Sequence, residues 1–219
     1  MSQARAIPDV KVRLTVIHPA IVRITHWLNA VAIVMMVMSG WQIYDASPLF
    51  GFRFPAWATL GGWLGGAIAW HLAAMWLLVV NGLVYAVYGL VSRHFARDFL
   101  PITPVAVVHT MRQALTFRLT HRLGTYNAVQ KLLYVAVLLC GVAAVASGLA
   151  LWKPVQLQWL AAALGSYSVV RYVHFFAMSG IVAFTIIHLL LVILVQSTLV
   201  AMITGRARVD ATADLEVLP

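Results

Sequence analysis

Four of the eight histidines stand inside long apolar stretches of the sequence: His26, His71, His174 and His188. Ionisable side chains at membrane depth are costly and rare, and they usually mark a functional site. His174 and His188 are 14 residues apart, so on one helix, at about 100° and 1.5 Å per residue, both rings face nearly the same way and lie about 21 Å apart along the axis. Neutral imidazole is a common axial ligand of haem iron. The spacing therefore predicts two stacked haems, each held by one imidazole from this helix and one from another helix.

The second ligand of each haem follows from the direction in which the chain crosses the membrane. His26 comes early in a helix that starts on the side where the helix of His188 ends, whereas His71 and His174 both come early in helices that start on the opposite side. We therefore predict two depth-matched pairs, His71 with His174 and His26 with His188. A proton relay and polar contacts between helices are the alternatives. A metal transporter is disfavoured, because no Asp or Glu falls within the four apolar stretches.

Two arginines and one glycine stand at positions suited to a haem. Arg23 precedes His26 by three residues and Arg171 precedes His174 by three, so each lies about one turn outward, where it could form an ion pair with a haem propionate. The alternative is an arginine that extends its charge to the membrane surface. Gly40 follows His26 by 14 residues and offers a position without a side chain at the level of the other haem, although glycine also marks helix–helix contacts.

The composition indicates a membrane protein. Of the 219 residues, 63% are hydrophobic and only 10% are charged, against about 25% charged in soluble domains. A membrane-spanning helix needs about 20 mostly apolar residues, and four stretches qualify: about 24–44, 64–90, 129–151 and 172–202. We predict an all-α integral membrane protein, a four-helix bundle that forms a single domain over residues 1–219. The fourth stretch is longer than the bilayer requires, which predicts a helix that tilts or extends beyond the membrane.

Cysteine content excludes several kinds of cofactor site. Cys140 is the only cysteine. One thiol cannot attach a c-type haem, hold an iron–sulfur cluster, form a cysteine-rich zinc site or build a disulfide scaffold.

The basic residues carry information about topology. The net charge is +9, and only three of the fifteen Lys and Arg residues, Arg53, Lys153 and Arg171, lie in the gaps on one side of the predicted membrane. The positive-inside rule then places both termini in the cytoplasm. We expect no nucleic-acid partner, because the basic residues are divided among several gaps and form no single groove or motif.

Several segments resemble a known family. They are HPAIVRITHWLNA at residues 18–30, WHLAAMWLLVVNG around His71, YNAVQKLLY at the start of the third span, and VHFFAMSG and IIHLLLV in the fourth. This pattern resembles the bacterial cytochrome b561 and nickel–iron hydrogenase b-type cytochrome family, and most of all its thiosulfate-reductase-type cytochrome b subunits, over residues 15–206. The resemblance implies a four-helix bundle with two non-covalent b haems. It implies that His26 and His188 ligate the cytoplasmic-side haem, and that His71 and His174 ligate the outer one.

The resemblance also implies a function in the bacterial inner membrane. Members exchange electrons between the quinone pool and a redox partner, such as a periplasmic molybdopterin-dependent oxidoreductase of a respiratory chain. An alternative is a self-contained enzyme that oxidises superoxide and reduces quinone, in which Arg53, Lys153 and Arg171 steer the anion. A second alternative is a non-redox transporter or scaffold.

Polar residues near the ends of the spans are candidates for a quinone site. Each of them is equally suited to cap a helix or to contact another helix. They are Asn29, Tyr126, Asn127, Gln130 and Gln196.

Overall fold

Four long helices dominate the computed structural model, which describes residues 12–93, 103–116 and 127–210. They are α1 (Ala20–Ala46), α2 (Leu64–Val91), α5 (Ala128–Trp152) and α7 (Tyr167–Leu194). Each is long and apolar enough to cross a membrane, with mean hydropathy between 1.7 and 2.5. The expectation of four membrane-spanning helices is confirmed, and the chain is a multi-pass membrane protein.

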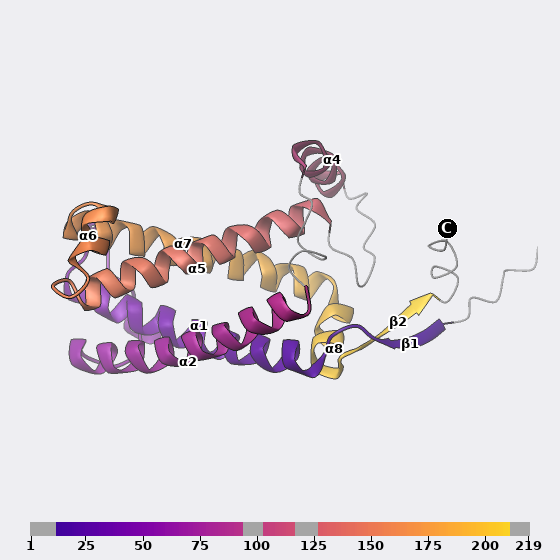
Figure 1. Cartoon of the computed structure of the whole chain (residues 1–219), viewed down its shortest axis with the longest axis horizontal. Coiled ribbons are helices and arrows are strands. Elements are labelled where there is room, and N and C mark those ends of the chain that lie inside the picture. Colours follow the sequence, from indigo (N-terminus) through magenta and orange to yellow (C-terminus); the bar gives the residue numbers. More distant parts are fainter. Residues whose placement is uncertain (1–11, 94–102, 117–126, 211–219) are drawn as a thin grey trace, which may run out of the picture.

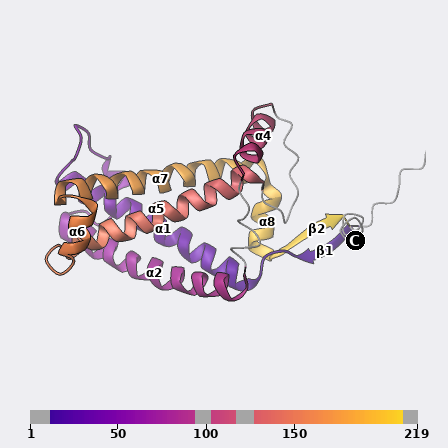
Figure 2. The same cartoon turned by 45° about the horizontal axis from the view of Figure 1, so that its top comes forward.

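The helices pack as two antiparallel pairs, α1 with α2 and α5 with α7, which lie side by side along their length (Figures 1 and 2). Most of the fully buried positions in these pairs are small, since Ala32, Ser39, Ser147 and Ala150 are each 0% exposed; Val170 of α7 is the largest side chain that is equally buried. Small side chains allow membrane helices to approach closely, so that dispersion and hydrogen bonds hold them together where lipid removes the hydrophobic driving force. Large apolar side chains such as Leu139 and Ile193 remain exposed and are available to lipid.

The chain folds differently from the prediction at the end of the fourth apolar stretch. A continuous span over residues 172–202 is wrong: α7 begins earlier, at Tyr167, and ends at Leu194. Val195 leaves the helical conformation, with φ −123° and ψ 71°, and a separate short helix α8 (Gln196–Thr204) follows. In Figure 1, α8 turns away from the axis of α7. The 28 residues of α7 already give a length of about 42 Å, so α8 is not needed to cross the bilayer.

A two-stranded antiparallel sheet joins the first and last parts of the described chain. β1 (Val12–Val16) pairs with β2 (Arg206–Asp210) in a register that sets Val12 opposite Asp210 and Val16 opposite Arg206. Apolar periodicity did not predict this sheet. It lies at one end of the bundle (Figure 1), which we call the sheet end. The segments before α1 and after α8 are therefore on the same side of the bundle, as an even number of spans requires, while their cytoplasmic location stays a prediction.

The opposite end, here the loop end, carries the connections between spanning helices. The 3-10 turn η1 (Ala56–Ala58) lies between α1 and α2, and α6 (Gln158–Leu164) lies between α5 and α7. Aromatic rings cover this end: Tyr44 contacts Phe54 and Phe175, with ring centres 5.3 and 5.4 Å apart. The remaining helix, α4 (Pro104–Leu115), comes from the middle of the chain and lies near the sheet end of α5 (Figure 1).

Candidate cofactor-binding site

The four histidines inside the spans meet as two pairs. At the loop end, His71 of α2 faces His174 of α7, with ring centres 6.3 Å apart. At the sheet end, His26 of α1 faces His188, also of α7, with ring centres 6.1 Å apart. We call these the loop-end pair and the sheet-end pair. We call α1 with α2 the first hairpin and α5 with α7 the second. Each histidine pair links α7 to one helix of the first hairpin, and the partners are the ones predicted from the depths of the histidines in the membrane.

The ring separations fit a metal ion between two imidazoles. Two bonds from imidazole nitrogen to a metal, of about 2 Å each, together with the distance from each nitrogen to its ring centre, give a separation on the order of 6 Å. Among the described residues, no group of three or more His, Cys, Asp or Glu could hold a metal ion. Two protein ligands are too few for a structural zinc site. They are sufficient for haem iron, because the macrocycle supplies the other nitrogens.

In the loop-end pair, the hydrogen bonds determine which nitrogen of His174 carries the proton. Nδ1 of His174 lies 3.0 Å from the carbonyl oxygen of Ala144 and 3.0 Å from Oγ of Ser147. A carbonyl oxygen only accepts hydrogen bonds, and Ser147 already donates its proton to the carbonyl of Ala143 at 2.6 Å. Nδ1 of His174 must therefore be the donor. The lone pair is then on Nε2, where it is available to a metal.

The first hairpin repeats this arrangement around His71. Nδ1 of His71 lies 3.0 Å from Oγ of Ser39, and the hydroxyl of Ser39 donates to the carbonyl of Met35 at 2.6 Å. His71 is therefore also a donor through Nδ1, with Nε2 left to bind a ligand.

A glycine follows each of these serines and lies against the histidine ring. A Cβ atom on Gly40 would come within 3.4 Å of Cε1 of His71, and one on Gly148 within 3.1 Å of Cε1 of His174. Gly40, which the sequence indicated as a position beside a haem, thus lies against the predicted ligand itself. The described contacts give it the role of admitting the imidazole close to α1.

The sheet-end pair has different surroundings. Nδ1 of His26 is buried and has no hydrogen-bond partner among the residues that the structure describes. The ring of His26 meets Trp27 edge to face, with centres 5.2 Å apart, and His188 stacks on Phe184 with centres 5.8 Å apart. Aromatic packing rather than hydrogen bonding therefore holds these two rings.

A buried asparagine beside this pair was not singled out from the sequence. Asn81 of α2 is 5% exposed, and its Nδ2 donates to the carbonyl of Thr25 and to Oδ1 of Asn29, each at 2.7 Å. Both acceptors belong to α1 within one turn of His26. An amide in the middle of an apolar run was the available signal, and its hydrogen bonds join α1 to α2 at the level of the sheet-end pair.

The two arginines have different environments. Arg171 donates to the backbone carbonyl and to Oγ of Ser47, and so attaches the start of α7 to the end of α1. Arg23 lies against the turn at Gly205, where a Cβ atom would come within 2.5 Å of Nη1 of Arg23. The Nε atom of Arg23 is buried, and no described residue forms a hydrogen bond with it. Arg23 thus keeps a buried donor near the sheet-end pair, whereas Arg171 has a partner in the protein.

Most of the polar residues considered for a quinone site have structural partners. Asn127 and Gln130 form a capping box at the start of α5: the backbone N–H of each donates to the side-chain oxygen of the other, at 3.0 and 2.9 Å. Asn29 accepts from Asn81, and Gln196 is the first residue of α8. Tyr126 lies outside the described residues. The helix-cap interpretation is therefore confirmed for Asn127 and Gln130.

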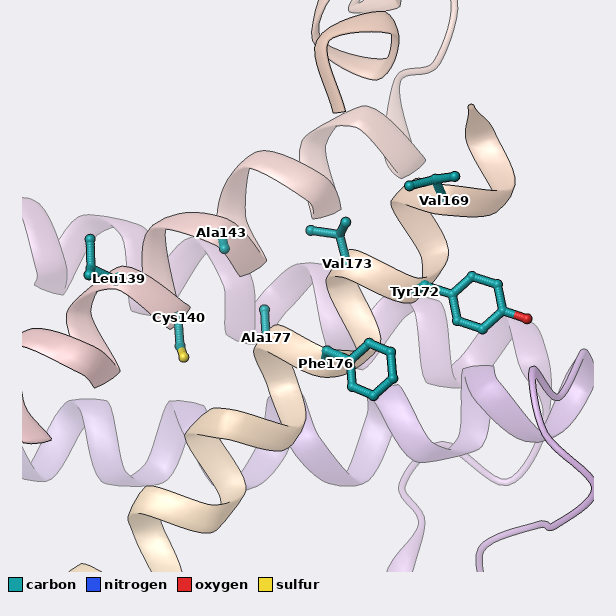
Figure 3. A pocket seen from close by; sticks show the side chains of 8 residues that line it. All are labelled: Leu139, Cys140, Ala143, Val169, Tyr172, Val173, Phe176 and Ala177. Atoms are coloured by element: carbon teal, nitrogen blue, oxygen red, sulfur yellow. The ribbon is translucent and has the colours of Figure 1, made fainter. Parts of the chain in front are cut away.

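An apolar groove between α5 and α7 lies apart from both pairs. Figure 3 shows its lining, which includes Cys140, Ala143 and Phe176, and its volume is about 480 Å³. None of the four paired histidines lines it, and the polar atoms of its lining side chains are the hydroxyl of Tyr172 and the sulfur of Cys140. A groove of this composition fits lipid chains, and its lining brings no further reactive group next to the paired histidines.

Comparison with known proteins agrees with the geometry. Residues 17–205 match the family model described as prokaryotic cytochrome b561. Over 191 residues the chain is 50% identical to the putative protein-methionine-sulfoxide reductase subunit YedZ1 of Azospira oryzae, an alignment that covers 87% of this chain and 96% of that protein. All four paired histidines fall within the matched region.

Proposed function

The chain belongs to the prokaryotic cytochrome b561 family, and we propose that it carries electrons across the bacterial inner membrane through two b-type haems. Membership of this family makes the chain a haem-binding membrane protein of electron transfer. The number of haems, their ligands and the redox partners are the parts that we propose. One haem is held by the loop-end pair and the other by the sheet-end pair.

The observation that carries this proposal is the pairing of two histidines of α7 with one histidine from each helix of the other hairpin. The ring centres are 6.3 and 6.1 Å apart, and the 14 residues between His174 and His188 separate the two levels by about 21 Å. A single α7 histidine would support one haem and no conduction through the membrane. Two levels on one helix support a path from one face of the bundle to the other.

When bound, haem supplies reversible one-electron transfer at the iron, and the chain supplies the ligands and their orientation. Ser39 and Ser147 hold His71 and His174 with the lone pair on Nε2. The exposed apolar side chains around the bundle keep water away from the helices. Arg23 has a buried Nε without a partner in residues 12–93, 103–116 and 127–210, and a haem propionate would satisfy it. Arg171 is the weaker candidate for this role, because its Nη2 already donates hydrogen bonds to Ser47.

The proposed partner is a periplasmic oxidoreductase that reduces methionine sulfoxide in proteins. This follows from the relative, which is named as a subunit of a protein-methionine-sulfoxide reductase, and from the molybdopterin-dependent partners that the sequence led us to expect. Reduction of a sulfoxide to a thioether consumes two electrons and two protons, so electrons would flow from a membrane quinol to the partner. With both termini in the cytoplasm, the loop end faces the periplasm. The haem at the loop-end pair would then pass electrons directly to the partner.

The self-contained superoxide oxidase is less well supported. Of the three cations expected to steer superoxide, Lys153 lies over the ring of Trp152, with Nζ 4.7 Å from the ring centre, and Arg171 is engaged by Ser47. Both contacts are with uncharged groups, so the three positive charges remain, but no other described feature favours superoxide as a substrate. A non-redox transporter or scaffold disagrees with membership of a cytochrome family.

The test is the haem content of the purified full-length protein. Haem extracted as its pyridine complex and divided by the polypeptide concentration should give two b-type haems per chain. A redox titration followed in the visible spectrum should show two one-electron transitions. A colourless preparation, or one haem per chain, overturns the proposal. Incubation of the oxidised protein with quinol or with superoxide then identifies the electron donor, and incubation of the reduced protein with quinone or with an oxidised sulfoxide reductase identifies the acceptor.

A further inference from the structure

The two hairpins build the same socket around the loop-end pair. In α1 the socket consists of the hydroxyl of Ser39 and the bare Cα of Gly40, both directed at His71. In α5 the residues at the same spacing, Ser147 and Gly148, are directed at His174, and the carbonyl of Ala144 is a further acceptor. Both imidazoles of one proposed haem are therefore hydrogen-bonded through Nδ1 in the same way.

The direction of these hydrogen bonds is settled by the serines. Each serine is 0% exposed and donates its own proton to the carbonyl four residues earlier, at 2.6 Å in both helices. The hydroxyl oxygen therefore accepts the proton of Nδ1, and no bulk water competes for it. In a low-dielectric interior such a bond polarises both partners more strongly than it does in water.

The sheet-end pair lacks this arrangement. Within the described part of the chain, Nδ1 of His26 is buried without a partner, and the described contacts of His188 are ring contacts with Phe184 and His26. The chain thus places one strongly hydrogen-bonded pair and one pair packed by aromatic rings on a common helix. Hydrogen-bond acceptors at the far nitrogen of a ligating histidine raise the basicity of the ligand.

We propose that Ser39 and Ser147 are positioning residues that lower the reduction potential of the loop-end haem by accepting the Nδ1 protons of its two ligands. A more basic imidazole donates more electron density to the iron and stabilises the ferric state relative to the ferrous state. The two serines thereby set the loop-end potential independently of the sheet-end potential. This inference rests on the proposed function, because it requires that His71 and His174 ligate haem.

The experiment is a redox titration of purified holoprotein with Ser39→Ala or Ser147→Ala. Ser179→Ala is the matched control. Ser179 also precedes a glycine and donates to the carbonyl four residues earlier, that of Phe175, but its described hydrogen bond reaches no histidine.

His71→Ala and His188→Ala identify which transition belongs to which haem. Each socket variant should favour the ferrous loop-end haem by about threefold to tenfold, a rise of about 28–59 mV for one electron. The sheet-end transition, and both transitions of the control, should stay unchanged.

Three results would overturn the inference: an unchanged loop-end potential, a fall in that potential, or an equal shift of both haems. Should an alanine variant lose the loop-end haem, Ser39→Cys and Ser147→Cys fill the same space with a poor acceptor. They should show the same rise, and its absence is equally decisive. Failure of the proposed function looks different, because the unmodified protein would then lack two haem transitions, or His71→Ala would remove neither.

Discussion

Oγ of Ser147 lies 3.0 Å from Nδ1 of His174 and gives its own proton to the backbone of α5. This relationship joins the two helices of the second hairpin and at the same time defines the chemistry of the histidine, because it leaves the lone pair on Nε2. Ser39 does the same for His71 in the first hairpin. The same hydrogen bond thus holds two helices together and leaves the Nε2 atom of the histidine free to bind a metal.

Replacement of single histidines should remove one haem at a time. His188→Ala should reduce the haem content from two per chain to one and leave the loop-end transition in place, while His71→Ala should leave the sheet-end transition. In the proposed assignment each variant removes one of the two ligands of one haem, and the two levels are about 21 Å apart. His109→Ala, in α4 and outside the spans, is the control and should keep both haems. Loss of both haems in each single variant, at unchanged folding, would contradict the assignment.

Substitution of the two socket glycines should have graded effects. A Cβ atom at Gly148 would come within 3.1 Å of Cε1 of His174, so the ring must move, whereas 3.4 Å at Gly40 is an ordinary contact with His71. Gly148→Ala should weaken retention of the loop-end haem on the order of tenfold, as other disturbances around a ligand do, and Gly40→Ala should be tolerated. The measurement is haem loss to apomyoglobin, followed spectroscopically for each level.

Gly82→Ala is the control for backbone effects, since among the described residues no atom outside the adjacent backbone of its own helix lies within 4 Å of a Cβ placed there. Alanine favours a helix over glycine by about 1 kcal/mol, so this variant should be at least as stable as the unmodified protein and should keep both haems. Equal haem loss in Gly148→Ala and Gly82→Ala would contradict the steric argument.

The spans and the histidine pairs could be predicted because both depend on local regularities. Hydropathy over about 20 residues locates a spanning helix, and the helical period places His174 and His188 on one face without any knowledge of packing. The depth of His26 and His71 needed only the alternation of chain direction. These arguments hold whatever the neighbouring helices are.

The features that the sequence did not predict depend on which helices meet. In the sequence, Ser147 is only a small residue in an apolar run, and its role follows from the contact with His174 of α7. The role of Asn81 likewise follows from its hydrogen bond to Asn29 of α1. The pairing of β1 with β2 joins segments from opposite ends of the chain, which a local pattern does not relate. The break at Val195 falls within an apolar run, where hydropathy carries no signal for the end of a helix.

Loss of Asn81 should destabilise the first hairpin. Asn81→Ala leaves the carbonyl of Thr25 and the side chain of Asn29 without the donor they now share, and hydrogen bonds between membrane helices are worth about 0.6–1.7 kcal/mol each. Thermal unfolding in detergent should shift to lower temperature. Ser92→Ala, at the end of the same helix and with an exposed hydrogen bond to Tyr88, should leave the transition almost unchanged. An unaltered transition in Asn81→Ala would show that these bonds add no net stability.

Removal of the charge of Arg23 should affect one haem only. Its buried Nε has no partner among the described residues, and we propose that a propionate of the sheet-end haem takes this place. A nearby positive charge favours the ferrous state, so Arg23→Gln should lower the sheet-end potential. A threefold change in the ferric–ferrous ratio, about 28 mV, is the expected size.

Arg171→Gln tests the contrast, because Ser47 already accepts hydrogen bonds from Arg171. This variant should loosen the loop end and leave both potentials close to their original values. A fall of the loop-end potential in Arg171→Gln, with no change in Arg23→Gln, would reverse this assignment and make Arg171 the partner of a propionate.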